Sequence, residues 1–405
     1  MPTVVLVGTL DTKGTEYAWL ADRIREREVD VVLVDAGIVG EPLAAPDISR
    51  DEVAAAVGAD ASALAAAGDR GAAVETMARG AAEIVARLHA EGRLDAIGGL
   101  GGSGGSALVT HAMRALPVGV PKLMVSTVAS GDTSPYVGSV DVTMMYSVVD
   151  IAGINQISAR ILANAAAALA GMAGATVPEL GEERPLIGAS MFGVTTPAVT
   201  TARERLEELG YEVLVFHQTG AGGGSMEELV KAGYLVGVLD VTTTEFCDLV
   251  VGGVLQAVPD RLESAGRAGI PQVVSLGALD MVNFGPLDTV PERFAGRNLY
   301  VHNPTITLMR TTPDECREIA ALIARKLNVA TGPTELFVPL RGVSAIATEG
   351  QVFYDPEADA ALIDTLRESI DPDVVRIVEI DADVNAPEFA LTMANRLHEL
   401  IGARS

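Results

Sequence analysis

The feature of this sequence that most constrains its fold is a regular alternation of short apolar runs with longer amphipathic stretches. Runs rich in Val, Ile and Leu lie at residues 4–7, 31–34, 96–100, 122–126, 186–189, 213–216, 236–239, 272–276, 299–302, 337–340 and 374–380. Most lack polar alternation, which is typical of parallel strands covered on both faces. Stretches with helical character lie between them, at residues 16–28, 71–90, 200–210, 313–327, 356–369 and 387–401. We therefore predict an α/β fold with doubly wound parallel sheets.

The two halves of the chain repeat a similar order of predicted elements. Residues 4–37 and 185–220 each give a strand, a polar loop, an amphipathic helix, a second strand and a glycine-containing loop. Either the halves arose by duplication, or they are alike only because both are α/β units. The polar, acidic segment VPELGEERP at residues 177–185 is bracketed by prolines and marks the boundary. We expect two Rossmann-like doubly wound subdomains, residues 1–180 and 185–405, with a cleft between them.

Composition narrows the classes of function. The 405 residues carry 29 basic and 54 acidic side chains, a formal charge of −25, which disfavours binding to nucleic acid or to anionic membranes. A local basic pocket for an anionic ligand remains compatible with this charge. Cys247 and Cys316 are too few for a disulfide framework or a cysteine-rich zinc site, so we expect free buried thiols.

The start of the chain and its most apolar stretch bear on where the protein is targeted. The first residues, MPTVVLVG, lack a basic region and lead straight into a strand pattern. The stretch at residues 161–177 contains Asn164 and is mostly Ala and Gly, so it falls short of a membrane span and predicts a buried helix. We expect a cytoplasmic protein.

Two loops of the first half have the chemistry of anion sites, and ligands of open α/β sheets bind outside the carboxyl ends of the strands. In GTLDTKGTE, residues 8–16, Asp11, Thr12 and Lys13 stand at a predicted helix start, where backbone N–H groups can hold phosphate. The alternative is helix capping with a solvated Lys13. GGLGGSGGSAL, residues 98–108, matches neither a Walker A sequence nor GxGxxG with its acidic partner. It predicts either a generic anion loop or a tight turn. Its candidate residues are Gly101, Gly102, Ser103, Gly104 and Gly105.

A third loop, STVASGDTSPYVG at residues 126–138, supplies Ser130, Gly131 and Asp132. Asp132 could hold Mg²⁺ through water or accept from a sugar hydroxyl; the alternative is an Asx turn ahead of Pro135. Weaker candidates are Asp35, after the second strand, and Arg70 with Gly71, which open a long helix.

The second half has its own polar strand ends. They include His217, Asp240, Glu245, Asp280, Asn283, His302, Asn303 and Arg310. Together they suggest a substrate pocket in which His217 or His302 could act as a base. From these we select His217, Asp240, Glu245 and Arg310 as candidate catalytic residues. The alternative is that these groups pair with one another and only hold the shape of the protein.

Taken in order, these loops resemble one known family. The matching segments are GTLDTKGTE, GLGGSGGSAL, MVSTVASGDTSPYVG, SVVDIAGINQISARILANAA, SMFGVTTPAV, VFHQTGAGGGSME, GVLDVTTTE, GALDMVNFG and HNPTITLMRTT. As an ordered set they resemble the ATP-binding domain family of the tomato mosaic virus resistance protein, which has many uncharacterised bacterial members. The resemblance runs from near the start to about Thr312 and is weaker beyond it.

The resemblance carries expectations about ligands and partners. It implies two Rossmann-like subdomains, binding of ATP with Mg²⁺, and a homodimer. The ATP contacts would map to Asp11, Thr12 and Lys13, with Asp35, Arg70 and Gly71 beside them. The plant protein binds a viral replication protein, a role that nothing in this acidic chain suggests. Some relatives carry a barrel domain after this region, so we expect any barrel-domain partner to be a separate polypeptide.

The resulting functional hypothesis is an ATP-dependent enzyme of acid or carbohydrate metabolism, a phosphotransferase or ligase. Lys13 and Arg70 would neutralise phosphate, Asp132 would serve Mg²⁺, and His217 or Asp240 would serve the small-molecule substrate. The first alternative is a nucleotide-sensing or regulatory protein without turnover. A dinucleotide-dependent oxidoreductase would suit the fold, but the sequence lacks its fingerprint.

Overall fold

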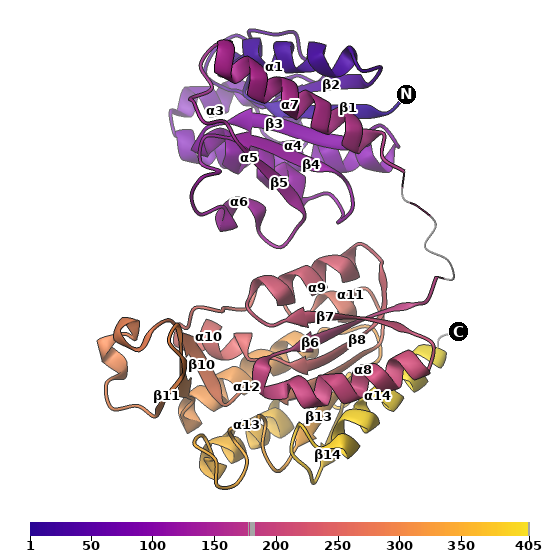
Figure 1. The fold of residues 1–405 in the computed structure, drawn as a ribbon, viewed down its shortest axis with the longest axis vertical. Coiled ribbons are helices and arrows are strands. Elements are labelled where there is room, and N and C mark those ends of the chain that lie inside the picture. Colours follow the sequence, from indigo (N-terminus) through magenta and orange to yellow (C-terminus); the bar gives the residue numbers. More distant parts are fainter. Residues whose placement is uncertain (177, 179–182, 404–405) are drawn as a thin grey trace. The chain divides into compact units, whose positions relative to one another are not determined.

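The computed structural model describes residues 1–176, 178 and 183–403, and it contains two compact units, Met1–Glu179 and Leu180–Ser405 (Figure 1). Within the predicted boundary segment, residues 177 and 179–182 lie outside the described residues. Each unit is an α/β layer structure with a parallel sheet flanked by helices, as the alternation of apolar runs predicts.

Unit 1 is built on a five-stranded parallel sheet in the order β2-β1-β3-β4-β5. Its strands are β1 Thr3–Gly8, β2 Asp30–Asp35, β3 Ala96–Gly101, β4 Lys122–Ser126 and β5 Val142–Tyr146. Its helices are α1 Leu10–Arg25, α2 Arg50–Ala55, α3 Ala61–Ala67, α4 Arg70–Ala90, α5 Ser103–Arg114, α6 Ser134–Val137 and α7 Gln156–Ala173.

Alternate side chains of β1 enter two separate cores. Val4 and Leu6 pack with α1 and α7, whereas Val5 and Val7 pack with α4 and α5 on the other face. Because both faces of the strand are buried, its sequence reads as a continuous apolar run. The stretch predicted as a buried helix belongs to α7, whose Leu162 and Leu169 are buried.

Unit 2 is built on a six-stranded parallel sheet in the order β14-β13-β9-β8-β6-β7, with a three-stranded sheet in the order β10-β12-β11. The strands of the larger sheet are β6 Leu186–Met191, β7 Glu212–His217, β8 Leu235–Thr242, β9 Gln272–Gly277, β13 Thr334–Pro339 and β14 Val375–Ile380. The smaller, antiparallel sheet contains β10 Met281–Phe284, β11 Leu299–Asn303 and β12 Ile306–Arg310.

The helices of unit 2 are α8 Thr196–Glu208, α9 Ala221–Lys231, α10 Glu245–Val251, α11 Ser264–Arg267, α12 Pro313–Leu327, α13 Pro356–Ser369 and α14 Pro387–Gly402. Short 3₁₀ turns lie at η1 Gly193–Thr195, η2 Leu287–Thr289 and η3 Glu292–Phe294. Cys247 and Cys316 are buried free thiols, as expected from the sequence.

The two parallel sheets are wound in the same order. Numbered along each unit, the strands of unit 1 lie in the order 2-1-3-4-5, and those of unit 2 repeat this order and add β14 as a sixth strand. This is the doubly wound order in which the first and third strands mark the switch point where ligands bind. The similar order of elements predicted from the two halves is therefore present in the fold.

The structure corrects several predicted elements. Strands β5, β10 and β12 were not predicted, and residues 299–302, read as a covered parallel strand, form part of the exposed antiparallel strand β11. Helix α1 begins at Leu10 rather than at residue 16, because the buried Asp35 carboxylate accepts the Leu10 N–H at 3.0 Å. Asp11, Thr12 and Lys13 therefore lie in the first turn of a helix, not in a loop before it.

Candidate functional site

The candidate site is a cavity at the switch point of unit 1. Strands β1 and β3 pair only as far as Leu6 and Gly98, and helices α1 and α5 then leave toward opposite faces of the sheet. A cavity of about 360 Å³ opens there. Its lining residues are Thr9, Asp11, Thr12, Lys13, Ala36, Ile38, Val39, Arg70, Val74, Met77, Gly101, Gly102, Ser103, Gly104, Gly105, Leu108 and Asp150.

Tyr17 holds the two strands at the point where they separate. Its buried hydroxyl accepts the Leu100 N–H at 2.8 Å and lies 2.6 Å from the Val7 carbonyl oxygen, to which it donates. Burial raises the pKa of Tyr17, so the hydroxyl stays protonated and can donate. A Cβ at Gly8 would overlap the Tyr17 ring, which explains the glycine at the end of β1.

The glycine-rich loop presents backbone to the cavity. Gly102 precedes α5, and no side chain in the described ranges caps this helix. The first N–H groups of a helix without a side-chain cap are a natural anion site, strengthened by the helix dipole. A Cβ at Gly104 would meet no atom within 4 Å, so protein packing does not require a glycine there. The bare backbone instead leaves room for a ligand.

Two cations line the same cavity. Lys13 is half-buried, and its ammonium donates to the Ile151 carbonyl oxygen. An ammonium has three N–H donors, so two remain for a ligand. Arg70 is exposed and is the first residue of α4. Both cations that were predicted from sequence therefore border the glycine-rich loop.

Asp11 also lines the cavity. Its Oδ2 accepts the N–H groups of Val39 and Gly40 at 2.6 and 3.3 Å. Its Oδ1 is buried and has no hydrogen-bond partner among the described residues. Asp150 adds a second carboxylate, which is exposed. Asp150 was not selected from the sequence, although it lies in SVVDIAGINQISARILANAA, one of the segments that carry the family resemblance.

Two residues predicted to bind the ligand, Asp35 and Gly71, do not line the cavity. Asp35 is 1% exposed and accepts from Leu10, from Gly37 at 2.9 Å and from Arg50 Nε at 3.0 Å. Its carboxylate is thus used within the protein and positions α1, so the expected contact of Asp35 with ATP is corrected. Gly71, inside α4, does not line the cavity.

The third loop also needs correction. Ser130, Gly131 and Asp132 are exposed and do not line the cavity. Asp132 accepts from the Ser134 hydroxyl and N–H at 2.7 and 3.0 Å, which lowers its pKa and forms the alternative Asx turn. Within the part of the chain that the structure describes, no cluster of three or more His, Cys, Asp or Glu residues could hold a metal ion.

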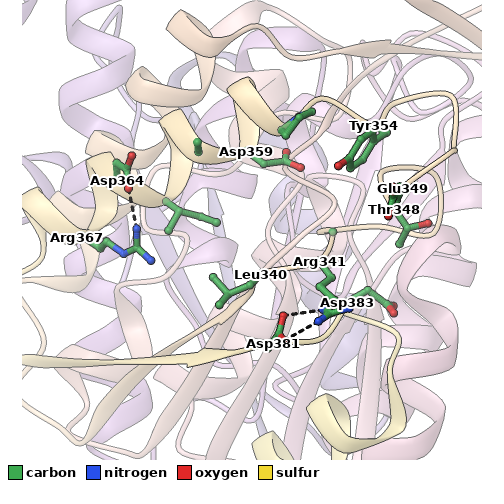
Figure 2. Close-up of a pocket in the computed structure, with 14 residues that line it drawn as sticks. Leu340, Arg341, Thr348, Glu349, Tyr354, Asp359, Asp364, Arg367, Asp381 and Asp383 are labelled. Atoms are coloured by element: carbon green, nitrogen blue, oxygen red, sulfur yellow. Dashed lines mark hydrogen bonds and ion pairs between the residues drawn. The ribbon is translucent and has the colours of Figure 1, made fainter.

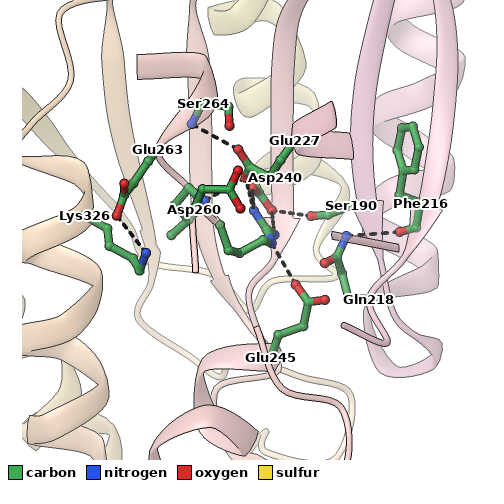
Figure 3. A network of polar contacts seen from close by, with 12 residues as sticks. Ser190, Phe216, Gln218, Glu227, Asp240, Glu245, Asp260, Glu263, Ser264 and Lys326 are labelled. Carbon is green, nitrogen blue, oxygen red and sulfur yellow. Dashed lines mark hydrogen bonds and ion pairs between the residues drawn. The ribbon is translucent and has the colours of Figure 1, made fainter. Parts of the chain in front are cut away.

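In unit 2, Asp240 and Glu245 belong to a buried ionic cluster rather than to an open pocket. Three buried carboxylates, those of Glu227, Asp240 and Glu245, pair with one guanidinium, that of Arg261. Figure 3 shows the three acidic residues together in one polar network. Arg261 donates to Asp240 Oδ1 at 2.6 Å and to Glu245 Oε2 at 2.7 Å. Burial raises the pKa of Glu227 and Glu245. The sequence analysis missed Arg261, which follows an irregular stretch.

Arg310 lies elsewhere, in β12. It is 4% exposed and donates to the Phe353 carbonyl at 2.8 Å and to Asp359 Oδ1 at 2.6 Å. Asp359 in turn lines a wide cavity of about 660 Å³ beyond the carboxyl ends of β13 and β14 (Figure 2). Arginines and carboxylates of this cavity pair with each other, as Arg341 does with Asp381 at 2.6 Å.

His217 is the one predicted catalytic residue with an exposed side chain, at the end of β7. The four candidates thus occupy three places, and the expectation of a single polar pocket is corrected. Asp240, Glu245 and Arg310 are buried and paired within the protein, but with Arg261 and Asp359 and not with one another, as the alternative had it.

The fold and the site define a two-unit α/β protein with a cavity, lined by two cations and an uncapped helix start, at the switch point of its first sheet. The chain belongs to the UPF0261 family: the models of its N-terminal and C-terminal domains match residues 2–178 and 184–401, and their description reads "Uncharacterised protein family". A UPF0261 protein of Clostridium tetani is 56% identical over 97% of this chain and 98% of its own length. The ToMV resistance protein Tm-1(GCR237) of Solanum lycopersicum is 39% identical over 98% of this chain and 56% of its own. The family resemblance inferred from the sequence is thereby confirmed.

Two solved structures show a distant likeness to the chain. MurG of Acinetobacter baumannii aligns with 100% of this chain and 93% of its own at a TM-score of 0.23 and 12% identity. A putative UDP-N-acetylglucosamine 2-epimerase of Listeria monocytogenes aligns with 100% and 96% at a TM-score of 0.25 and 10% identity. These scores carry no functional inference. None of the described helices has the length and apolar character needed to cross a membrane.

Proposed function

We propose that unit 1 binds ATP with Mg²⁺ in the switch-point cavity and that the protein is an ATP-dependent enzyme of acid or carbohydrate metabolism. The observation that carries the proposal is the convergence of Lys13, Arg70 and the uncapped start of α5 on one cavity. Helix N–H groups, an ammonium and a guanidinium are the groups that bind phosphate.

The rest of the cavity suits a nucleoside. Apolar side chains of Ile38, Val39, Val74, Met77 and Leu108 share its lining. Ligand sites commonly combine such apolar walls with a few polar groups, in cavities of roughly 300–1,000 Å³. The cavity, at about 360 Å³, falls within that range.

The carboxylates that line this cavity fit Mg²⁺ better than Asp132 does. Mg²⁺ usually binds one or two carboxylates together with ligand phosphates. Asp150 is exposed at the cavity, and Asp11 Oδ1 is a buried acceptor with no partner in the described chain. Asp11 and Asp150 would hold the ion, which when bound supplies neutralisation of phosphate charge.

One observation favours the second candidate function, nucleotide sensing without turnover. Asp240, Glu245 and Arg310, chosen from sequence as catalytic, are buried among protein partners. A binding protein needs no such groups to be available, whereas an enzyme needs catalytic groups that reach the substrate. Detection of ADP or AMP release in the presence of a metabolite panel separates the two candidates.

The binding proposal is tested with Lys13→Ala by calorimetric titration of ATP and adenosine in the presence of Mg²⁺. Loss of a charge-assisted hydrogen bond of about 1.5–3 kcal/mol should weaken ATP by roughly 10- to 150-fold and leave adenosine nearly unchanged. Arg25→Ala is the matched control, because Arg25 is a cation at the far end of the same helix, paired with Asp22. Equal ATP affinity in Lys13→Ala and the parent would refute the phosphate contact.

A further inference from the structure

A smaller cavity in unit 2 has the features of a separate ligand site. It has a volume of about 240 Å³, and it is lined by Phe192, Gly193, Val194, His217, Thr219, Leu255, His302, Asn303, Ile306 and Leu308. Phe192 follows β6, and His217 ends β7, so the cavity lies at the carboxyl edge of the sheet, where α/β proteins bind ligands. The antiparallel strands β11 and β12 supply its other wall.

The polar groups of this cavity are mostly not used within the protein. Neither the His217 nor the His302 imidazole makes a hydrogen bond to any residue in the described ranges. Asn303 Oδ1 accepts the N–H and the hydroxyl of Thr305, both at 2.9 Å. These two bonds do not use the amide NH₂ group, which can therefore donate to a ligand. The His217 ring stacks on Phe192 with centroids 5.2 Å apart and planes 25° apart. The stacked pair forms a flat aromatic surface at the edge of the cavity.

The charge of the cavity is unusual for this chain. The protein carries 54 acidic residues, yet the lining of this cavity includes neither Asp nor Glu. The other two cavities described above each include carboxylates. Imidazole and amide N–H groups without a competing carboxylate favour an anionic or hydrogen-bond-accepting ligand head. Val194, Leu255, Ile306 and Leu308 favour an apolar body.

We propose that this cavity binds a small carboxylic acid with a planar or branched apolar body. Its carboxylate accepts hydrogen bonds from His217, His302 and the Asn303 amide, and its body packs on Phe192 and the apolar floor. The ligand is small because the cavity falls below the roughly 300–1,000 Å³ of sites for drug-sized molecules. This inference does not depend on ATP binding, since every lining residue belongs to unit 2.

A larger side chain at Gly193 can narrow the cavity without disturbing packed residues. A Cβ at Gly193 would meet no atom within 4 Å, so a larger side chain there enters open space and not packed protein. Gly193→Val should therefore narrow the cavity with little effect on folding. Val301→Ala is the matched control for His302→Ala. Val301 is the exposed neighbour of His302 on β11, and it does not line the cavity.

The test is calorimetric or ligand-observed NMR titration with benzoate, phenylacetate and isovalerate, each beside its uncharged amide. At least one acid should bind saturably, with its amide at least about 10-fold weaker. Gly193→Val should abolish this binding and His302→Ala should weaken it at least about 10-fold, while Val301→Ala and Lys13→Ala leave it unchanged. Thermal unfolding of each variant verifies that it is folded.

Two outcomes would overturn the proposal: no saturable binding of any of the acids up to about 10 mM, or equal binding by Gly193→Val and the parent. Lys13→Ala is titrated with both ATP and the acids, so the two failures can be told apart. Failure of the ATP site appears as unchanged ATP affinity in this variant, and failure of this cavity appears as absent acid binding.

Discussion

The two glycine-rich loops of the chain look alike in sequence, but their glycines have different structural roles. Each follows a strand and opens a helix, α5 in unit 1 and α9 in unit 2. In unit 1 a Cβ at Gly104 would enter open space. In unit 2 a Cβ at Gly222 would overlap the His217 carbonyl, and one at Gly223 would overlap the Glu245 carboxylate. Glycine in the first loop leaves room for a ligand, whereas glycine in the second is required by packing.

The same contrast holds at the two switch points. Where β1 and β3 separate, a single neutral hydroxyl, that of Tyr17, satisfies the backbone and leaves a cavity above it. Where β6 and β8 separate, Ser190 Oγ accepts the Thr242 N–H at 2.8 Å and donates to Asp240 at 2.6 Å, and Arg261 fills the space beyond. One winding order therefore gives an open switch point in unit 1 and a filled one in unit 2.

The strongest test of this difference is Arg261→Ala. It would leave Glu227, Asp240 and Glu245 buried without their cation, and breaking a buried ion cluster costs about 3–5 kcal/mol. Chemical denaturation followed by circular dichroism measures the loss. The single tryptophan, Trp19, lies in α1, so its fluorescence reports unit 1 separately. Arg341→Ala, which breaks an exposed pair, is the control and should change stability little.

A loss below about 1 kcal/mol for Arg261→Ala would mean that the cluster is solvated, and the filled switch point would then have to be reconsidered.

The next test compares Gly222→Ala with Gly104→Ala. The first inserts a methyl group against the His217 carbonyl and should destabilise the protein by about 1–3 kcal/mol. The second places a methyl group in open space within a helix, where Ala is about 1 kcal/mol better than Gly, so the protein should be equally or more stable. Thermal unfolding gives both values. Gly104→Ala should nevertheless lower the affinity for ATP measured by titration. Similar losses of stability in both variants would contradict the contrast between the loops.

Tyr17→Phe tests the open switch point. The change leaves the buried Leu100 N–H without its acceptor and the Val7 carbonyl without a donor, at a cost of about 1–3 kcal/mol. Urea denaturation followed by Trp19 fluorescence measures it. Tyr211→Phe is a gentler comparison, because the one partner of that hydroxyl among the described residues is a partly exposed His398. An unchanged midpoint in Tyr17→Phe would show that water replaces the hydroxyl.

The last test concerns the pH dependence of stability in unit 2. In unit 2, burial raises the pKa of Asp280 from 3.8 to about 6, an increase that Arg310 limits. The folded state holds this proton more tightly than the unfolded state. The contribution of protonated Asp280 to the free energy of unfolding is therefore fully present below pH 3.8 and is lost as pH rises through about 6. Asp280→Asn should reduce the fall in unfolding free energy between about pH 4 and about pH 7. The amide oxygen of the asparagine can accept the Ser344 hydroxyl as Oδ2 does, and its NH₂ group can take the position of the unpaired Oδ1. Parallel pH profiles for variant and parent would contradict the assignment.

Sequence reasoning located the open site better than the filled one. Continuous apolar runs predict covered strands, and the rule that ligands bind at strand ends brought Lys13 and the Gly101–Gly105 run to one cavity. It could not show whether a polar strand-end residue faces a ligand or a buried partner. Asp240 and Arg310 have the same local appearance as site residues, but their partners Arg261 and Asp359 lie 21 and 49 residues away.

The antiparallel sheet escaped prediction for a related reason. Strands β10 and β12 carry Asn283 and Arg310 in buried positions, so their sequences resemble polar loops. Only tertiary partners, the Asp248 carboxylate for Asn283 and Asp359 for Arg310, make these residues compatible with a core.

The bond between Asp35 and the Leu10 N–H has a consequence for the rotational phase of helix α1. Successive residues of a helix are turned by about 100°, so the residue at which α1 starts decides which side chains face which neighbour. Lys13 and Glu16, one turn apart, both hold the segment that carries Asp150, through the Ile151 carbonyl and the Gly153 N–H. A start displaced by one residue would swing both contacts away together. A carboxylate that does not line the cavity thus sets the angular position of its lysine and, through the same helix, the place of its second acid.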